Sequence, residues 1–338
     1  MTKDYSIFIG TVGNGLQVSR NRGERWQATP VGGLEGNVRA LAVFPDDPHR
    51  LLAGSDGTGI YRSDDNGATW EKLDSPMEGM EIWSIDVDPE DHDRIYVGTR
   101  PEGFRSLDGG STWEALPMGV DRNAMLYPPR TTKILVDPND SRTIWAGTEV
   151  NGVYRSEDGG ESWRRLPDLG PSPWHQDNHC LAIRNGDRRA IYVTGPEGLA
   201  TSVDDGETWR IEALPPVRDE KGDVFSTGER VPDHAYCRGM IIKPDDPDTM
   251  FIGTGNTIPG EVGGIQRTRD GGETWEYVSL PVLPNSVVYW LGTHPESPDV
   301  IAAASIFGYV YLSEDGGETW TKPRRELGHV RAVAVTPS

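Results

Sequence analysis

The sequence is poor in cysteine and in long apolar runs. Its 338 residues include two cysteines, Cys180 and Cys237, which are too few for a disulfide framework. No apolar stretch approaches the roughly 18 residues that a transmembrane helix needs. The start, MTKDYSIFIG, lacks the basic segment and long apolar segment of a secretory signal. We therefore predict a soluble cytoplasmic protein with reduced thiols and no membrane partner.

Basic residues are also scarce, since 33 Lys and Arg face 53 Asp and Glu, for a net charge of −20. Such a surface repels phosphate backbones, so we predict no nucleic-acid partner. Several motifs of nucleotide and hydrolase sites are missing. The sequence has no G-x-x-x-x-G-K-[ST], no G-x-S-x-G, no H-E-x-x-H, and no G-x-G-x-x-G between a strand and a helix. No helical periodicity of useful length occurs, which favours an all-β fold.

An octapeptide with the pattern S-x-D-x-G-x-T-W is repeated along the chain. Its seven copies start at Ser19, Ser63, Ser106, Ser156, Ser202, Thr268 and Ser313. Successive starts are 44, 43, 50, 46, 66 and 45 residues apart, which is the length of one four-stranded propeller blade. Between the copies, short β-branched or apolar runs alternate with Gly, Pro and Asp turns, as in VRALAV, RLLAGS and GTGIYRS.

Each conserved-looking position of the octapeptide has a structural use. The Gly at position five tolerates the positive φ of a hairpin turn. The Asp at position three can accept hydrogen bonds from N–H groups of its own loop. The final Trp, which accounts for seven of the eleven tryptophans, can bury its ring between neighbouring sheets. We therefore interpret these carboxylates as structural rather than catalytic.

This pattern resembles the Asp-box, or BNR repeat, of sialidases, xyloglucanases, sortilin-like receptors and Ycf48-type photosystem II assembly factors. The resemblance covers nearly the whole chain, although the first copy has Asn21 in the Asp place and Arg25 in the Thr place. It implies a β-propeller with the octapeptide turns on the face opposite the functional one.

We predict a seven-bladed β-propeller of four-stranded blades in a single domain, residues 1–338. The C-terminal run HVRAVAVTPS should pair with the N-terminal run YSIFIGTVGNGLQVS, which closes the ring and removes exposed sheet edges. The blades are expected at about 330–338 plus 5–29, 37–73, 81–116, 131–166, 178–214, 236–280 and 287–322.

The first strand of each blade should line the central channel. Aligned on the turns that follow them, these strands place one residue each in a common tier: Arg331, Arg39, Trp83, Thr132, His179, Arg238 and Tyr289. Guanidiniums converging on one axis would recognise a carboxylate, phosphate or sulfate. We predict that Arg39, Trp83, Thr132, Arg238 and Arg331 bind substrate. The alternative is that each arginine pairs with an acid of a neighbouring blade, such as Asp86 or Glu81.

The long loops between blades should lie on the same face as this tier, where function concentrates. They span residues 117–133, 167–180 and 215–239, with an insert at 255–264. Two of them hold His175, His179 and His234 beside Asp177 and Asp233. A divalent ion such as Zn²⁺ could be held by His175, His179, His234 and Asp177. The spacing matches no named metal motif, so the alternative is histidines with local hydrogen bonds.

Acidic residues occur in the loops between the second and third strands: Asp56, Glu102, Glu149, Glu197 and Glu261. Carboxylates paired across a channel would suit acid–base glycoside chemistry. The alternative is that they only solvate the loop tips.

These observations favour an enzyme, a hydrolase or lyase, acting on an anionic or sugar-like substrate at the channel mouth. His179 or His234 would act as base or metal ligand, and Tyr289 as proton donor or nucleophile. Sialidases resemble six-bladed rings with an F/Y-R-I-P signature that is absent here, so we predict no sialidase activity. Xyloglucanases resemble two propellers facing across a cleft, and one ring lacks that cleft.

Two non-catalytic alternatives stay open. A single seven-bladed ring with an arginine-bearing face resembles the Ycf48-type factors, which implies a scaffold that binds a peptide or protein. A glycan-binding module is the other alternative, in which Trp174 and Trp83 stack on sugars.

Overall fold

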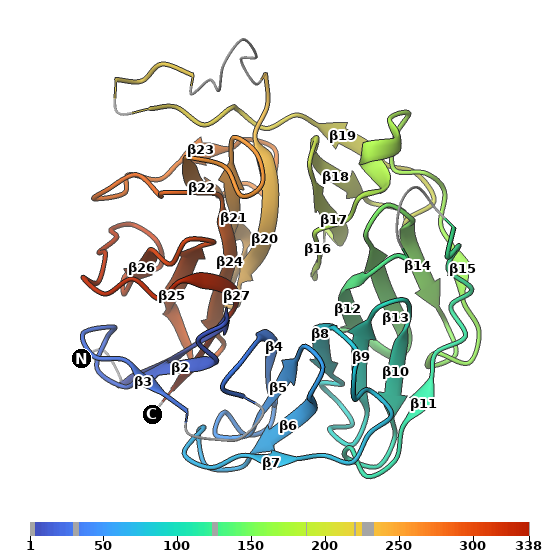
Figure 1. Ribbon diagram of the computed structural model, residues 1–338. Coiled ribbons are helices and arrows are strands. Elements are labelled where there is room, and N and C mark those ends of the chain that lie inside the picture. Colours follow the sequence, from blue (N-terminus) through green and yellow to red (C-terminus); the bar gives the residue numbers. More distant parts are fainter. Residues whose placement is uncertain are drawn as a thin grey trace.

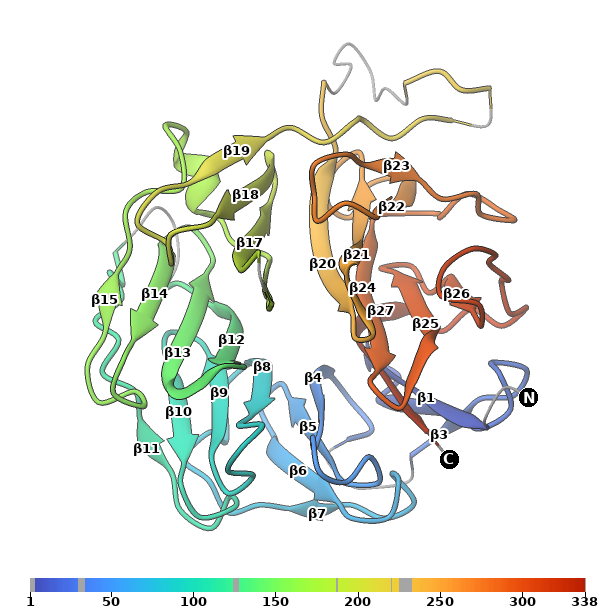
Figure 2. The same cartoon turned by 180° about the vertical axis from the view of Figure 1, so that it is seen from behind.

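The computed structural model describes residues 4–29, 34–123, 128–186, 188–219, 221–224 and 233–337, which form seven antiparallel sheets around a central axis (Figures 1 and 2). The strands next to the axis are β27 (His329–Pro337), β4 (Val38–Val43), β8 (Ile82–Val87), β12 (Thr131–Asp137), β16 (Cys180–Arg184), β20 (Tyr236–Lys243) and β24 (Val288–His294). Each of these inner strands contacts the next one all the way round the ring. The predicted seven-bladed propeller is confirmed.

The other strands follow outward in chain order. The second strands are β1 (Tyr5–Val12), β5 (Leu51–Ser55), β9 (Ile95–Thr99), β13 (Asp140–Thr148), β17 (Ala190–Gly195), β21 (Asp246–Gly255) and β25 (Ser297–Ser305). The third strands are β2 (Leu16–Ser19), β6 (Gly59–Ser63), β10 (Gly103–Ser106), β14 (Gly152–Ser156), β18 (Gly198–Ser202), β22 (Gly263–Thr268) and β26 (Val310–Ser313). The short outer strands are β3 (Gln27–Ala28), β7 (Glu71–Lys72), β11 (Glu114–Ala115), β15 (Arg164–Arg165), β19 (Arg210–Glu212) and β23 (Glu276–Tyr277).

Helical structure is minimal. A 3-10 turn, η1 (Pro173–Gln176), precedes β16, and Ser172 caps it by accepting a hydrogen bond from the Trp174 backbone N–H. Within the described ranges no helix is long and apolar enough to cross a membrane.

The ring closes as predicted, by pairing the two ends of the chain. β27 runs antiparallel to β1, from Tyr5 opposite Pro337 to Val12 opposite His329, with a bulge between Gly10 and Thr11. Ile7 and Ile9 of β1 are buried in one apolar cluster with side chains of β27 and β25. The closing strand β27 therefore contributes side chains to the hydrophobic core in addition to its backbone pairing with β1.

The seventh blade departs from the four-strand pattern. Its outer strand is reduced to a single bridge between Leu312 and Thr321. In other blades the residue three after the octapeptide Trp donates its backbone N–H inward, as Leu73 does to the Ile60 carbonyl at 3.0 Å. Pro323 occupies that position here and has no N–H, so pairing stops.

The octapeptide turns confirm the structural interpretation of their carboxylates. In the second copy Asp65 accepts hydrogen bonds from the Thr69 backbone N–H at 2.8 Å and the Thr69 hydroxyl at 2.6 Å. The Ser63 hydroxyl donates to Asp65 at 2.9 Å and accepts from the Gly67 N–H at 2.8 Å. In the first copy Asn21 replaces this carboxylate and still accepts from the Arg25 N–H at 2.9 Å.

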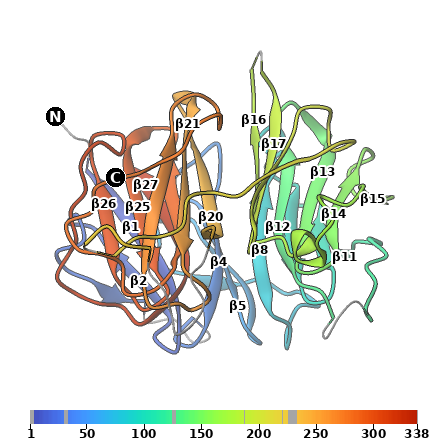
Figure 3. The ribbon, with the colours of Figure 1, turned by 90° about the horizontal axis from the view of Figure 1, so that it is seen from above.

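The strands run between two faces of the ring (Figure 3). On one face the octapeptide turns contact the turns that follow the inner strands, since the Asn66 N–H donates to the His49 carbonyl at 2.7 Å. We call it the octapeptide face. On the other, Asp56 in the β5–β6 loop forms a bridge with Glu81, just before β8. We call this the inter-blade face, because the loops between blades lie there.

Candidate functional site

The structure brings together all seven side chains of the predicted tier. Together with Trp290 of β24, they line one small space of about 20 Å³: Arg39, Trp83, Thr132, His179, Arg238, Tyr289 and Arg331. That volume holds about one water molecule. The tier therefore nearly fills the channel and forms a floor beneath its mouth on the inter-blade face.

The three tier arginines have different partners. Arg39 forms an ion pair with Asp56 and lies over the Trp83 ring, 4.6 Å from its centre. Arg238 and Arg331 both lie over the ring of Tyr289, at 4.2 and 4.8 Å. Neither of these two forms an ion pair with a carboxylate in the part of the chain that the structure describes. Arg39 is therefore paired with an acid of its own blade, Asp56, and not with one of a neighbouring blade as the alternative proposed; the structure shows no such ion pair for Arg238 or Arg331 among the described residues.

The charges of Arg238 and Arg331 are compensated to different extents. Burial would lower the pKa of Arg238, but Tyr289, Tyr236 and Asp177 outweigh it and raise that pKa. Burial, together with the nearby Arg39 and Arg238, lowers the pKa of Arg331. The Nε atoms of Arg238 and Arg331 are buried and lack a hydrogen-bond partner among the described residues. An anion bound above the tier would supply the missing acceptor and relieve the repulsion between guanidiniums.

A second layer lies toward the mouth, formed by the residues two positions before the tier. Glu81, Arg130, Asp177 and Tyr236 stand two residues before Trp83, Thr132, His179 and Arg238. Arg130 lies over Trp83 at 4.4 Å, and the Trp83 indole N–H donates to Glu81 at 3.0 Å. The sequence analysis assigned no role to Arg130 or Tyr236. The same alignment, read two residues upstream, would have found them.

The His179 side chain is only 2% exposed, so it would affect a substrate only through a neighbouring side chain such as Tyr236. Its Nδ1 lies 2.6 Å from the Cys237 carbonyl, so this nitrogen carries the proton. Its Nε2 lies 3.2 Å from the Tyr236 hydroxyl and 3.5 Å from Asp177 Oδ2. Burial and Arg238 lower the pKa of His179, which favours the neutral ring. The neutral imidazole can therefore accept a hydrogen bond from the Tyr236 hydroxyl, whose proton is held firmly because burial raises the pKa of Tyr236.

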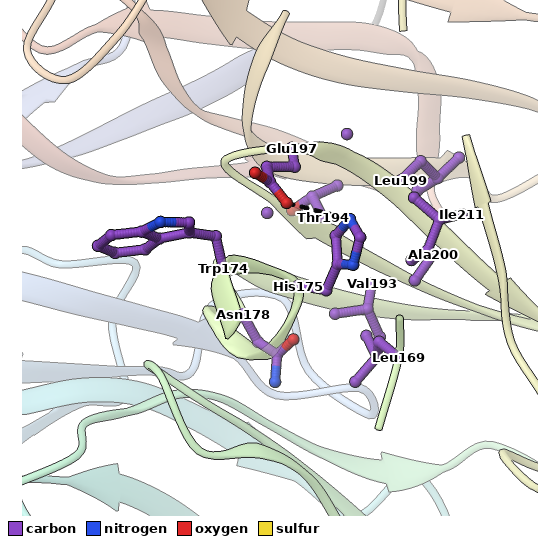
Figure 4. A pocket seen from close by; sticks show the side chains of 12 residues that line it. Leu169, Trp174, His175, Asn178, Val193, Thr194, Glu197, Leu199, Ala200 and Ile211 are labelled. Atoms are coloured by element: carbon purple, nitrogen blue, oxygen red, sulfur yellow. Dashed lines mark ion pairs between the residues drawn. The ribbon is translucent and has the colours of Figure 1, made fainter. Parts of the chain in front are cut away.

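The predicted metal group is not assembled. Within the described ranges no three His, Cys, Asp or Glu side chains are close enough to hold an ion. His175 Nε2 instead lies 3.1 Å from Glu197. Figure 4 shows this pair, with the exposed Trp174 indole pointing away from it. His234 Nδ1 lies 2.6 Å from Asp233. The loops that carry these histidines do not follow the strand repeat. Their positions in the sequence therefore did not predict which histidines lie close together in the structure.

His234 also falls outside the tier, so its predicted role as a base has no geometric support. It does not line the tier space. Part of its loop, residues 220 and 225–232, lies outside the described residues. Tyr289 is in the tier, but its ring is covered by Arg238 and Arg331 and is 5% exposed.

The acids of the second-to-third strand loops do more than solvate loop tips. Three form ion pairs with arginines, namely Asp56 with Arg39, Glu102 with Arg122 and Glu149 with Arg130, and Glu197 lies against the His175 ring. Glu261 is exposed.

Glu149 and Asp177 stand apart because their surroundings shift their pKa values in opposite directions. Burial raises the pKa of Glu149, and the charge of Asp177 adds to this. Burial would raise the pKa of Asp177 as well, but His179, Arg238 and Arg130 outweigh it and lower that pKa. At one pH, therefore, Glu149 holds its proton more readily than Asp177. Such divergence is typical of an acid and its partner carboxylate in catalysis.

The loop that presents Glu149 is held firmly between β13 and β14. The Glu149 N–H donates to the Arg130 carbonyl at 2.8 Å, and Arg130 Nη1 returns a 2.8 Å bond to the Glu149 carboxylate. The Thr148 hydroxyl donates to the Gly152 carbonyl at 2.7 Å. Val150 between them has a φ of 56°, a conformation that β-branched residues rarely adopt. Such strain is typical of functional loops.

Known proteins match this chain in part. A family model described as "Sortilin, neurotensin receptor 3" matches residues 58–168. A probable oligoxyloglucan-reducing end-specific xyloglucanase of Neosartorya fischeri is 26% identical over 331 residues, covering 93% of this chain and 36% of the relative. The chain spans about a third of the length of the curated xyloglucanases it matches.

Solved structures share the fold. The GH74 xyloglucanase from Xanthomonas campestris superimposes with a TM-score of 0.66 at 17% identity, over 97% of this chain and 52% of that one. A structure of YCF48 bound to D1 peptide gives a TM-score of 0.54 at 17% identity, over 84% and 81% of the two chains. The chain thus belongs to the seven-bladed β-propellers, with the fold of these xyloglucanase and Ycf48 structures.

Proposed function

We propose that the mouth of the channel on the inter-blade face binds a carboxylate-bearing oligosaccharide and hydrolyses its glycosidic bond. A xyloglucanase that is 26% identical to this chain, in an alignment that covers 93% of the chain, supports a carbohydrate-active hydrolase. The observation that carries the proposal is the pair Glu149 and Asp177, whose pKa values are pushed apart beside the same arginines, Arg130 and Arg238.

The roles follow from these surroundings. Glu149, with its raised pKa, is the general acid that protonates the leaving oxygen. Asp177 stays ionised and faces the developing positive charge on the sugar, or directs a water molecule to it. The Tyr236 hydroxyl, held by its hydrogen bond to His179, contacts the substrate as a neutral hydrogen-bonding group.

Binding falls to the tier. Arg238 and Arg331 donate hydrogen bonds to the substrate carboxylate, because neither forms an ion pair with a carboxylate within the described residues. The half-buried Trp83 offers the edge of an aromatic ring between Arg39 and Arg130. These groups favour an anionic sugar over a neutral one.

The test is hydrolysis of a panel of oligosaccharides, measured as the release of reducing ends. The panel contains uronic-acid oligosaccharides and neutral xyloglucan fragments. We expect Glu149→Gln to lower kcat at least about 100-fold with little change in KM, because a general acid acts in the transition state. The matched control is Glu212→Gln on β19, whose pKa is also raised by burial but which lies on an outer strand. Equal activities of these two variants would reject the proposal.

A non-catalytic scaffold for peptides is the second candidate. It is favoured by the same two arginines, Arg238 and Arg331, which form no ion pair with a described residue and would also bind a peptide carboxylate. Fluorescence anisotropy with an acidic peptide and its amidated form separates the two functions. Tight binding of the free acid alone, with no turnover of any glycan, would favour the scaffold.

A further inference from the structure

A second and larger space occupies the channel on the other side of the tier. It measures about 440 Å³, and its walls are inner-strand side chains such as Leu41, Val43, Met240, Ile242, Leu291 and Val333. His294, Pro295 and Glu296, in the turn after β24, lie at its rim, so the cavity reaches toward the octapeptide face. Its volume is that of a small-molecule site, and most of the residues that line it are apolar.

The tier separates this cavity from the proposed active site. Trp290 lines both the 20 Å³ tier space and the 440 Å³ cavity, so its side chain stands between them. A ligand in the cavity therefore does not need the residues at the mouth on the inter-blade face. Binding in this cavity is therefore independent of the hydrolysis proposed for the channel mouth.

One cation, Lys133 of β12, lines the deep part of this apolar cavity. It directly follows Thr132 of the tier, which places it near the closed end. Its ammonium group forms no hydrogen bond or ion pair with any described residue, whereas Lys72 pairs with Glu78 and Lys243 with Asp245. The other ionisable groups that line the cavity are His294 and Glu296 at the rim and the buried Cys180 thiol, which donates to the Met240 carbonyl.

We infer that the half of the channel facing the octapeptide turns binds a small molecule with an apolar body and a single carboxylate, which forms an ion pair with Lys133. One ammonium matches one negative charge, whereas a phosphate would favour the paired donors of an arginine. Burial of the hydrocarbon against the aliphatic walls supplies most of the affinity. The ion pair fixes the orientation, with the carboxylate at the closed end and the apolar end toward the rim.

The test uses octanoate as the probe and 1-octanol as its uncharged counterpart, with binding measured by isothermal titration calorimetry. Wild-type protein should bind octanoate with a stoichiometry of one and at least about tenfold more tightly than 1-octanol. Lys133→Met keeps an unbranched side chain and should remove that preference, leaving the affinity for 1-octanol unchanged. Lys72→Met, on the exposed outer strand β7, should change neither affinity.

Two further variants keep the inference falsifiable if Lys133→Met also affects folding. Asp86→Asn removes a negative charge that acts on Lys133, and should tighten octanoate binding about threefold without affecting 1-octanol. Leu41→Trp fills the cavity and should abolish binding of both probes. Absence of octanoate binding, equal affinities of wild-type protein for both probes, or wild-type octanoate binding by Lys133→Met would overturn the inference.

Discussion

Asp86 of β8 accepts a hydrogen bond from the Val136 N–H at 2.8 Å, yet its surroundings disfavour its charge. Burial raises its pKa to about 6, and Lys133 and this hydrogen bond offset only part of the effect. Because the pKa is raised, the folded protein loses stability as the pH rises from about 4, where the unfolded carboxyl ionises, through about 6.

Asp86→Asn removes that loss. Between pH 4 and pH 8, the free energy of unfolding of this variant relative to wild type should rise by about 2 kcal/mol. Urea unfolding of both proteins at the two pH values measures the difference, and the other carboxylates cancel in the comparison. A difference that does not change with pH would contradict the account.

Arg39 and Arg331 occupy the same tier and should respond differently to removal of their charge. Arg39→Met leaves Asp56 without its partner, so we expect a loss of about 2 kcal/mol in the free energy of unfolding. Arg331→Met removes a cation that its neighbours repel and should cost less than about 0.5 kcal/mol while weakening anion binding. Chemical denaturation measures both, and equal losses would show that Arg331 is a structural partner.

The sequence predicted the residues of the tier better than their partners. The seven tier residues share a strand register that the following turns make visible, so one alignment placed them all. Asp56 was grouped with the loop acids and was not seen as the partner of Arg39, because a pairing between strand and loop leaves no repeat in the sequence. The histidine loops contain no repeated pattern, so the sequence offered no guide to their geometry, and among the described residues the predicted metal ligands do not come together.

At the scale of elements, the octapeptide turn is the unit that recurs. Asp158 accepts hydrogen bonds from the Ser162 hydroxyl at 2.6 Å, the Ser162 N–H at 2.9 Å and the Ser156 hydroxyl at 2.8 Å. These bonds, that from the Ser162 hydroxyl first, lower its pKa to about 2. Because the pKa is lowered, the stability that the carboxylate contributes is present above about pH 4 and is lost as the pH falls through about 2.

Replacement of Asp158 tests whether this turn needs an acceptor or a charge. Asp158→Ala should cost about 1–2 kcal/mol at pH 7, since the turn N–H groups lose their acceptor. Asp158→Asn should cost less than half of that, because Asn21 already serves in the first copy. The melting temperatures of the two variants provide the measurement. An Asn variant as unstable as the Ala variant would show that the charge matters more than the acceptor.

The strand pattern was predictable from sequence wherever the turn residues repeat. The outer strand of the seventh blade was not, although its cause is visible in the sequence as Pro323 at a position where other blades use a backbone N–H. The repeat is found by comparing the copies of the octapeptide. The missing backbone N–H of Pro323 is noticed only when each backbone hydrogen bond of the outer strand is assigned to a donor.

At the scale of the molecule, stability depends on closure of the ring. β27 contributes Val330, Val333 and Val335 to a buried cluster shared with β1 and β25. A chain that ends at residue 328 should therefore lose cooperative unfolding, and a peptide of residues 326–338 added in excess should restore it. Circular dichroism melts with and without the peptide measure this. A cooperative transition without the peptide, at the wild-type temperature, would show that closure is dispensable.

Closure also creates both halves of the channel, since every tier residue comes from, or just before, a different inner strand. The fold and the tier were predictable because they follow from one repeat. The acid pair was not, because Glu149 and Asp177 belong to loops of different blades, and only the ring brings them to the same arginines.

The pH dependence of kcat/KM for a uronic-acid oligosaccharide tests the central claim most directly. The account predicts a bell-shaped profile, with an acidic limb below the usual range of an aspartate, set by Asp177, and an alkaline limb above the usual range of a glutamate, set by Glu149. In Glu149→Gln the residual activity should lose the alkaline limb and keep the acidic one. An unchanged profile in that variant, or no turnover of any glycan at any pH, would contradict it.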